Sequence, residues 1–167
     1  MNVRILQGSD ARLYQELRLS ALITNPEAFG STYEREVKFP LDTVIEGLVP
    51  AKGKFVLGAF DGNGLLVGIV IFVRENYLKF AHKGNVFGMY VAPEGRGRGI
   101  GKLLMVELIN KAKTCDGLEQ INLTVVSENV SAKKLYRSLG FEVYGVERNA
   151  LKYNVQYFDE DLMVLKV

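Results

Sequence analysis

A glycine-rich segment lies between a predicted strand and a predicted helix, and it restricts the possible folds more than any other feature. Residues 85–91 are typical of a strand, and an apolar stripe at helical spacing begins at Ile100. The stripe consists of Ile100, Leu103, Leu104, Leu108 and Ala112. Gln120 to Val126 then alternates apolar and polar residues, as a second strand does. A strand, a helix and a strand in this order predict a crossover connection within one sheet.

The rest of the chain predicts further strands and helices around the same sheet. Strands are expected at Val3 to Leu6, Phe55 to Phe60, Leu65 to Val73, Phe141 to Arg148 and Tyr157 to Val167. Helices are expected from an N-cap at Asp10 to about Thr24, from near Thr32, from Pro40 to Gly47, and from Ser127 to Leu139 before Gly140. This order predicts one α/β or α+β domain over residues 1–167, with a mostly antiparallel sheet.

Two of these segments also predict which side chains are buried. The first long helix carries Leu13, Leu17, Ala21 and Leu22 along one stripe. In the strand 65–73, simple alternation places Leu65, Val67, Ile69, Ile71 and Val73 on one face and Leu66, Val70 and Phe72 on the other. Because both faces are apolar, we expect this strand in the centre of the sheet.

The composition excludes several classes of protein. Of the 167 residues, 48% are hydrophobic and 24% are charged, which is typical of a globular domain. The formal net charge of +2 gives no reason to expect nucleic acid as a partner. The longest apolar run, Leu65 to Val73, is too short to span a membrane. With Cys115 and His82 as the only residues of their types, we expect no disulfide framework, no metal and a reducing, cytoplasmic location.

The glycine-rich segment has the properties of a phosphate-binding turn. Glycines at alternate positions from Gly97 to Gly101 leave backbone N–H groups uncovered where a strand turns into a helix. The N-terminus of that helix adds a partial positive charge. A Walker A loop is excluded, because it requires Gly at 96 and Ser or Thr at 103, where this chain has Arg96 and Leu103. A dinucleotide fingerprint requires a glycine where Lys102 stands.

Two motifs in this region resemble those of the GNAT-type N-acetyltransferase superfamily. Its acetyl-coenzyme A signature is Arg or Gln, two residues, Gly, one residue, and Gly or Ala, which Arg96, Gly99 and Gly101 fill in register. The superfamily's asparagine, tyrosine and Gly-Phe helix motif is matched by Asn129, Ala132, Leu135, Tyr136, Gly140 and Phe141. Weaker similarity at Pro26 to Ser31 and at Tyr157 to Met163 extends the resemblance over nearly the whole chain.

The resemblance implies a fold and a cofactor. The implied fold is a central, mostly antiparallel sheet of six to seven strands with a splayed strand pair, flanked by about four helices. The implied co-substrate is acetyl-CoA, with its pyrophosphate on backbone amides of the turn and its pantetheine arm along the splayed strand. The implied contacts are Met89, Tyr90, Val91, Arg96, Gly97, Arg98, Gly99, Ile100, Gly101, Lys102 and Asn129.

The resemblance also implies a reaction, in which a primary amine attacks the acetyl thioester directly in a ternary complex. Tyr136 would be the general acid for the coenzyme A thiolate, and a main-chain N–H of residues 89–91 would stabilise the oxyanion. The general base stays open among Glu128, Glu34, Asp159 and a water relay.

The acceptor amine is not determined by the sequence. The resemblance implies contacts from Phe29, Tyr33, Glu34 and Tyr157, whose aromatic and acidic groups suit a cationic amine. A small-molecule amine and a protein or peptide N-terminus both stay open, as does a homodimer, which is common in the superfamily. The alternative is a catalytically silent acyl-CoA-binding sensor or regulatory module. Tyr136 argues against that alternative, because a pure binder needs no acid there.

Overall fold

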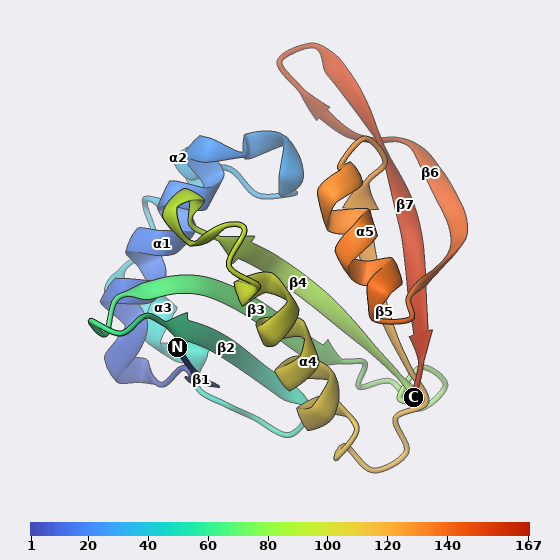
Figure 1. Ribbon diagram of the computed structural model, residues 1–167, viewed down its shortest axis with the longest axis horizontal. Helices are drawn as coiled ribbons and strands as arrows, with labels where there is room; N and C mark the ends of the chain where they lie inside the picture. The colour runs from blue at the N-terminus through green and yellow to red at the C-terminus, as the bar shows by residue number, and fades with distance from the viewer.

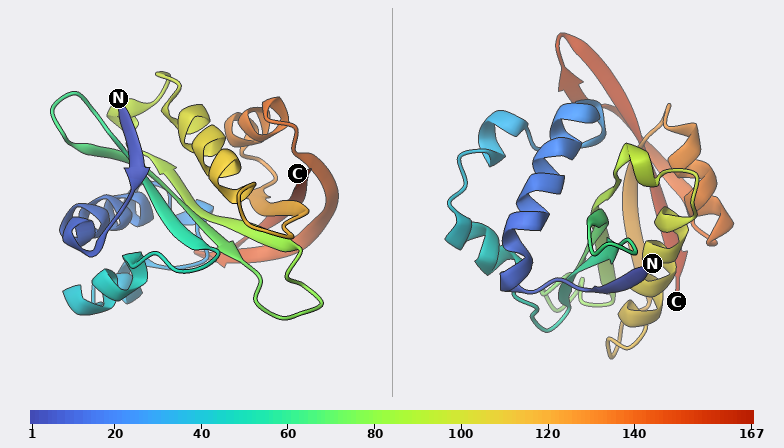
Figure 2. Two further views of the ribbon diagram at one scale, coloured as in Figure 1. Left: turned by 90° about the horizontal axis from the view of Figure 1, so that it is seen from below. Right: turned by 60° about the vertical axis from the view of Figure 1, so that its left-hand side comes forward.

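A seven-stranded sheet with helices on both faces forms the core of the computed structural model, which describes residues 1–167 (Figure 1). The strands are β1 (Asn2–Ile5), β2 (Lys54–Phe60), β3 (Leu66–Arg74), β4 (Lys83–Val91), β5 (Gln120–Val126), β6 (Glu142–Tyr153) and β7 (Gln156–Lys166). The helices are α1 (Ala11–Thr24), α2 (Tyr33–Glu36), α3 (Leu41–Leu48), α4 (Ile100–Ala112) and α5 (Val130–Ser138). Figure 2 shows α1 and α3 on one face of the sheet and α4 and α5 on the other. The expected mixed fold is therefore confirmed.

The strand order is β1-β2-β3-β4-β5-β7-β6, and every neighbouring pair but one is antiparallel. The exception is β4 and β5, which run parallel and are joined by the crossover through α4. This confirms the single crossover predicted at the glycine-rich turn. The parallel ladder is only three residue pairs long, from Lys83 with Gln120 to Asn85 with Asn122.

Two separate hydrophobic clusters hold the helices on the sheet. Under α4 and α5, Leu104, Leu108 and Met163 are fully buried within a cluster of 19 residues. On the opposite face, α1 and α3 cover a cluster of 12 residues that includes Leu17 and Leu48. β3 contributes to both clusters, which confirms its predicted central position.

The predicted faces of β3 are wrong at its first residues, because the strand contains a bulge. Ala59 of β2 pairs with Gly68 while Phe60 pairs with Leu66, so Val67 is the extra residue. The bulge reverses the alternation: Val67 joins the α4 face together with Val70 and Phe72, and Leu66 joins the α1 face together with Ile69. Leu65 lies before the strand and is 51% exposed.

Three smaller expectations also need correction. Leu13 is exposed, because the buried stripe of α1 is formed by Ala11, Leu17, Ala21 and Leu22. Asp10 precedes α1 but does not cap it, since its carboxylate accepts from the backbone N–H of Gln7 and forms a bidentate pair with Arg4. The helix expected from Ser127 begins at Val130, after the Asn129 cap.

A buried ion pair fixes α5 on the sheet. Asp161 on β7 accepts from the Ser127 hydroxyl at 2.5 Å and pairs with the Lys133 ammonium of α5 at 2.7 Å. These partners, Lys133 first, hold the pKa of Asp161 below its ordinary value.

None of the helices has the length and apolar character needed to cross a membrane.

We predict that Asp161→Asn lowers the free energy of unfolding by about 2 kcal/mol at pH 7, because the Lys133 ammonium loses its buried partner. The ionised Asp161 stabilises the fold above the ordinary pKa of an aspartic acid, and this contribution is lost as the pH falls through its lowered pKa. Urea unfolding should therefore show a difference between wild type and variant that narrows toward pH 3. Asp116→Asn, at an exposed turn, is the control and should leave stability unchanged.

Candidate active site

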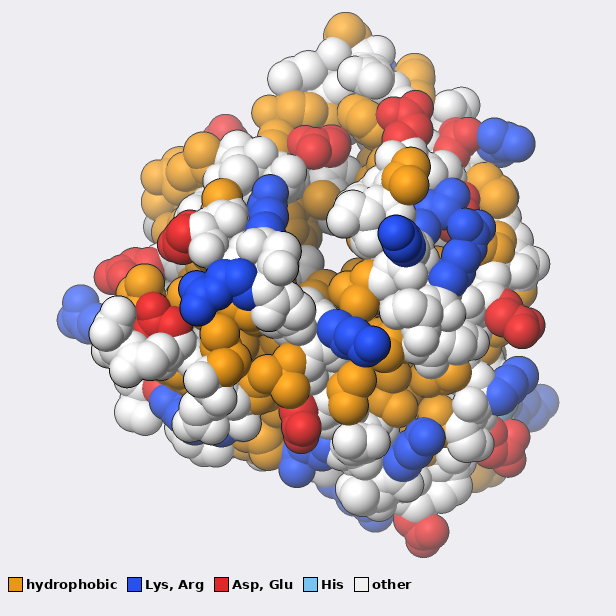
Figure 3. Space-filling view, viewed as in Figure 1, with side chains coloured by type: hydrophobic (Ala, Val, Ile, Leu, Met, Phe, Trp, Pro, Cys, Tyr) orange, Lys and Arg blue, Asp and Glu red, His pale blue; other side chains and the backbone are white.

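A cleft of about 950 Å³ opens where β4 and β5 separate. Beyond Asn85 and Asn122 the two strands have no ladder contact, so residues 86–91 of β4 and 123–126 of β5 have free backbone edges toward each other. The cleft is lined from α1, the short helix η2 (Pro26–Ala28), β4, the glycine-rich turn, β5, α5 and β7. Figure 3 shows the hollow between the two halves of the molecule, with Lys and Arg side chains around it.

A bulge in β4 accompanies the separation of the strands. Ile71 of β3 pairs with Phe87, and Ile69 pairs with Tyr90, so two residues of β4, Gly88 and Met89, lie opposite one residue of β3. Gly88 has a φ of +58°, a conformation that favours glycine. A bulge bends its strand, which fits the departure of β4 from β5 at this level. The splayed pair implied by the resemblance is therefore present.

The glycine-rich turn presents a row of unpaired backbone donors. None of the six N–H groups from Gly97 to Lys102 donates to a backbone carbonyl, and the ladder of α4 begins with the Leu103 N–H on the Gly99 carbonyl. Gly97 and Gly99 have φ values of +73° and +76°, and a Cβ at either would meet nothing within 4 Å. The turn is thus open to an anion on the side of these donors.

Gly101 is needed for a different reason, which is close packing. A Cβ on Gly101 would lie 3.2 Å from Met89 of β4 and 3.3 Å from Leu135 of α5. The first turn of α4 therefore sits directly against both walls of the cleft. This contact brings the unpaired N–H groups near the space between β4 and α5.

Arg96 fixes the turn rather than standing free at its edge. Its Nε donates to the Val91 carbonyl at 3.0 Å, and its Nη2 donates to the Asn25 side-chain oxygen at 2.8 Å. The guanidinium also lies over the Tyr90 ring, 5.6 Å from its centroid. Arg98 and Lys102 are exposed and form no ion pair, so they are the cations of the turn that remain available to a ligand.

The wall on the α1 side is built from stacked aromatic and cationic groups. Phe29 meets Tyr90 edge to face with ring centroids 6.3 Å apart, and the Arg18 guanidinium lies 4.9 Å above the Phe29 ring. Arg18 is held in place by a bidentate pair with Glu36. Together with the link from Arg96 to Asn25, these contacts tie η2 to the glycine-rich turn.

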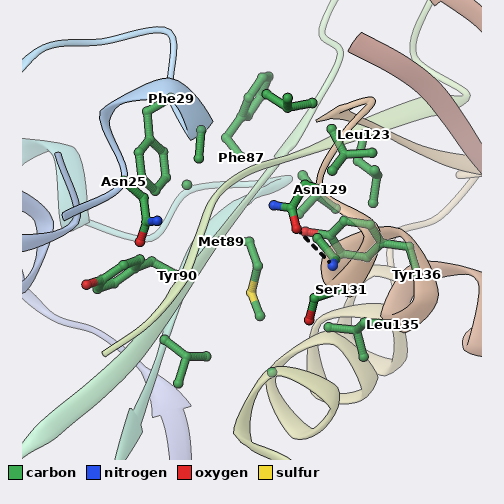
Figure 4. A pocket seen from close by; sticks show the side chains of 18 of the residues that line it. Asn25, Phe29, Phe87, Met89, Tyr90, Leu123, Asn129, Ser131, Leu135 and Tyr136 are labelled. Atoms are coloured by element: carbon green, nitrogen blue, oxygen red, sulfur yellow. Dashed lines mark hydrogen bonds between the residues drawn. The ribbon is translucent and has the colours of Figure 1, made fainter. Parts of the chain in front are cut away.

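The wall on the α5 side carries the two polar residues of the second motif. Asn129 caps α5, because its side-chain oxygen accepts from the Ala132 N–H at 3.1 Å, and it also lines the cleft. Tyr136 lies two turns further on, is 7% exposed, and packs edge to face on Phe141. Burial raises the pKa of Tyr136 to about 12. Figure 4 shows Met89 projecting between this wall and that of Phe29 and Tyr90.

Most of the predicted site residues meet at this cleft. Those that line it are Phe29, Met89, Tyr90, Val91, Arg96, Gly97, Gly99, Ile100, Gly101, Lys102, Asn129 and Tyr136. Arg98 projects from the turn outside the lining, and Tyr33, Glu34 and Tyr157 also lie outside it. Tyr157 is instead 54% exposed, with the Lys152 ammonium 5.1 Å from its ring centroid.

The candidate bases differ in their placement. Glu128 lines the cleft from the turn between β5 and α5 and is exposed, whereas Glu34 on α2 is exposed and does not line the cleft. Asp159 is bound by the Arg148 guanidinium at 2.6 Å and by the Asn149 N–H at 2.8 Å, and it does not line the cleft.

Several lining residues were not predicted from the sequence as parts of the site. They include Arg18, Asn25, Phe87, Gly88, Thr124, Phe158 and Glu160. For Glu160 a signal exists, since alternation along β7 places it on the opposite face from Asp161 and the buried Met163. Arg18 and Asn25 carry no comparable signal, because their approach to the cleft depends on how α1 packs.

The unpaired N–H groups at the cleft are suited to a ligand that carries phosphate, and comparisons with known proteins give the family of the chain. Residues 14–141 match the model of the acetyltransferase (GNAT) family, so the chain belongs to this family and is an N-acetyltransferase. It is 27% identical over 161 residues to the L-amino acid N-acetyltransferase AaaT of Escherichia coli K12, with 95% of each chain covered.

Solved structures have the same fold. A GNAT-family acetyltransferase from Streptococcus pneumoniae superposes with a TM-score of 0.88 at 23% identity, with 99% of each chain covered. The acetyltransferase yncA from Salmonella typhimurium, solved with its cofactor acetyl-CoA, superposes with a TM-score of 0.84 at 23% identity. This match covers 99% of the present chain and 93% of that protein.

We predict that wild-type stability falls by about 2 kcal/mol between pH 10 and pH 12 through Tyr136 alone. The raised pKa keeps the folded phenol neutral in this range, while the unfolded phenol ionises. The contribution of Tyr136 to the free energy of unfolding is complete below the ordinary tyrosine pKa and is lost as the pH rises toward 12. Urea unfolding of wild type and Tyr136→Phe at pH 8 and pH 11 measures this effect, and the variant should lose less stability. Equal losses in the two proteins would contradict the burial of this hydroxyl.

Proposed function

We propose that this protein transfers the acetyl group of acetyl-CoA to a primary amine by direct attack within a ternary complex, with Tyr136 as the general acid. The observation that carries the proposal is the row of six unpaired N–H groups from Gly97 to Lys102, at one end of a cleft that reaches Tyr136. Family membership supports acetyl-CoA as the co-substrate.

The donor binds along β4 and the first turn of α4. The unpaired N–H groups and the helix N-terminus hold the pyrophosphate, while the cations of Arg98 and Lys102 lie at its edge. The pantetheine arm pairs with the backbone edge of β4 that β5 leaves free. A main-chain N–H of residues 89–91 then stabilises the oxyanion of the tetrahedral intermediate.

Tyr136 supplies the proton for the leaving group. With a pKa of about 12 the phenol is protonated throughout the neutral range, so it enters each cycle with a proton to give. The acid acts as the carbon–sulfur bond breaks and charge develops on sulfur. Packing against Phe141 holds the ring in one orientation for this transfer.

The acceptor that we favour is the amino group of a small molecule such as a free amino acid. The similarity to an L-amino acid N-acetyltransferase over 95% of both chains supports this choice. A protein N-terminus is the second acceptor to be tested. Phe29 offers an acceptor contact inside the cleft, and Tyr33, Glu34 and Tyr157 would contact only an acceptor that extends beyond it. Homodimer formation and a cytoplasmic location stay predictions.

Calorimetric titration with acetyl-CoA, followed by a thiol-release assay over amino acids, polyamines and peptides, tests the proposal directly. Binding together with thiol release for one acceptor class is the expected result. Binding without release on the whole panel would favour the regulatory acyl-CoA sensor instead. An absence of binding would refute the phosphate site at Gly97 to Lys102.

We predict that the double variant Arg98→Gln with Lys102→Gln weakens acetyl-CoA binding about 10-fold, because two charge-assisted contacts to phosphate are lost. Binding of acetyl-pantetheine, which lacks the pyrophosphate, should not change. Lys113→Gln at the other end of α4 is the matched control and should keep wild-type affinity. A Kd within twofold of wild type in the double variant would show that neither cation contributes to phosphate binding.

We predict that Tyr136→Phe lowers kcat by about 10² or more, because the thiolate then leaves without a proton donor. The Kd for acetyl-CoA should stay within about threefold of wild type, since the ring and its packing on Phe141 are kept. Steady-state kinetics and calorimetry on the same preparation separate the two effects. Unchanged turnover would refute the assignment of Tyr136 as the acid.

A further inference from the structure

The alternation of side chains along β7 separates two neighbouring carboxylates onto opposite faces of the sheet. Asp161 points to α5, where it binds Ser127 and Lys133. Glu160, one residue earlier, lines the cleft from the other face, which is the face that α1 and η2 cover. Glu160 therefore faces the side of the cleft that lies away from α5.

Glu160 also sits at the level where the strands have separated. In the β5–β7 ladder it pairs with Val126, the last residue of β5, and Thr124 of β5 lines the cleft beside it. Across the β6–β7 ladder it lies directly opposite Glu147. Two carboxylates at directly paired positions repel each other, so the hairpin holds Glu160 in an unfavourable electrostatic position.

We propose that Glu160 is the general base of the reaction, which takes the proton from the ammonium group of the acceptor on the face of the sheet opposite to Tyr136. This inference rests on the proposed function, and it assigns a residue to the base that the motifs leave open. Glu160 is half-buried in the cleft wall and has no ion-pair partner, in contrast to Asp159 and Asp161 on the same strand.

The surroundings of Glu160 favour a carboxylate that can hold a proton. Burial, followed by the charge of Glu147, raises its pKa above the ordinary value, and the Thr124 hydroxyl opposes this rise. The other titratable groups that line the cleft are Arg18 on α1, Glu27 on η2, Tyr90 on β4, Arg96 and Lys102 at the glycine-rich turn, Glu128 after β5 and Tyr136 on α5. None of them forms a salt bridge with Glu160, and the Arg18 guanidinium is bound to Glu36.

The proton balance of the cycle closes with one base and one acid. Glu160 accepts a proton from the ammonium, and the free amine nitrogen forms a bond to the thioester carbon. The tetrahedral intermediate then breaks its carbon–sulfur bond, with the electron pair going to sulfur and the Tyr136 proton following it. The amide nitrogen releases its extra proton, which restores the Tyr136 phenol through water of the cleft. Glu160 finally gives its proton to solvent, so each turnover releases one proton.

The positions of the two groups fit the two substrates. Tyr136 belongs to the cluster under α4 and α5, which lies on the side of the unpaired N–H groups of the turn. Glu160 lies on the side of Phe29 and Phe87, toward α1. The acetyl group would therefore reach the gap between β4 and β5 from one face, and the amine would reach it from the other.

The test compares wild type with Glu160→Gln over the pH range in the thiol-release assay. We expect kcat to fall by about 10² or more near pH 7. In wild type, kcat should rise to a plateau on an acidic limb, whereas in Glu160→Gln it should keep rising with pH until the acceptor itself loses its proton. Glu160→Asp should restore the plateau at a reduced rate, because it returns a carboxylate on a shorter side chain. Calorimetry should give an unchanged Kd for acetyl-CoA in both variants.

Two neighbouring variants make the test specific to this carboxylate. Asp159→Asn removes the adjacent carboxylate, which faces Arg148 outside the cleft, and should keep kcat within about twofold of wild type. Glu147→Gln removes the repulsion across the ladder, so it should move the acidic limb of kcat to lower pH. A purely structural role for Glu160 would not produce this movement.

The possible outcomes distinguish a failure of the base assignment from a failure of the proposed function. A wild-type protein that releases no thiol with any amine would overturn the proposed function and, with it, the assignment of Glu160 as the base. If wild type is active and Glu160→Gln keeps both its rate within threefold and its acidic limb, the assignment of the base alone is overturned. The assignment would also be overturned if Glu160→Gln lowers kcat but Glu147→Gln leaves the acidic limb at the same pH. The limb would then report the titration of another group.

Discussion

The early end of the β4–β5 ladder is the constraint on which the remaining structure depends. Three parallel pairs join the strands, and beyond Asn85 and Asn122 each strand keeps a partner on its other edge only. β4 stays paired with β3, and β5 is paired with β7 over its full length. Each half of the sheet therefore keeps its own ladder without the missing pairs, and the unpaired backbone groups face an open cleft rather than a core.

Two glycines on either side of the split allow close packing that a larger residue would prevent. At Gly84, which forms the middle pair of the β4–β5 ladder with Ile121, a Cβ would lie 2.4 Å from the Phe72 ring, so only glycine fits there. Gly101 has the corresponding role on α4, against Met89 and Leu135. The Gly101 contacts place the first turn of α4 between β4 and α5, so its N-terminal N–H groups lie at the same cleft as the separated strands.

The local parts of this arrangement could be predicted from the sequence, and the parts that depend on register could not. The crossover, the cap at Asn129 and the glycine turn follow from short segments whose residues interact with near neighbours. The bulges at Val67 and Gly88 depend on how two strands align, which no short segment encodes. The bond from Arg96 to Asn25 joins residues 71 positions apart, so the anchoring role of Arg96 becomes visible only in the fold.

The same distinction explains why the class of reaction is easier to infer than the acceptor. The glycine-rich turn and α5, which line one side of the cleft, lie within the stretch 14–141 that matches the family model. The opposite wall combines Arg18 and Phe29 from the beginning of the chain with Phe158 and Glu160 from its end, and the latter two lie beyond that stretch. β6 and β7 pair with each other and join the sheet only through β5, while the Asp161–Lys133 ion pair is the link from this hairpin to α5. This wall therefore depends on tertiary contacts between the two ends of the chain, and its residues lie outside the two motifs that resemble those of the family.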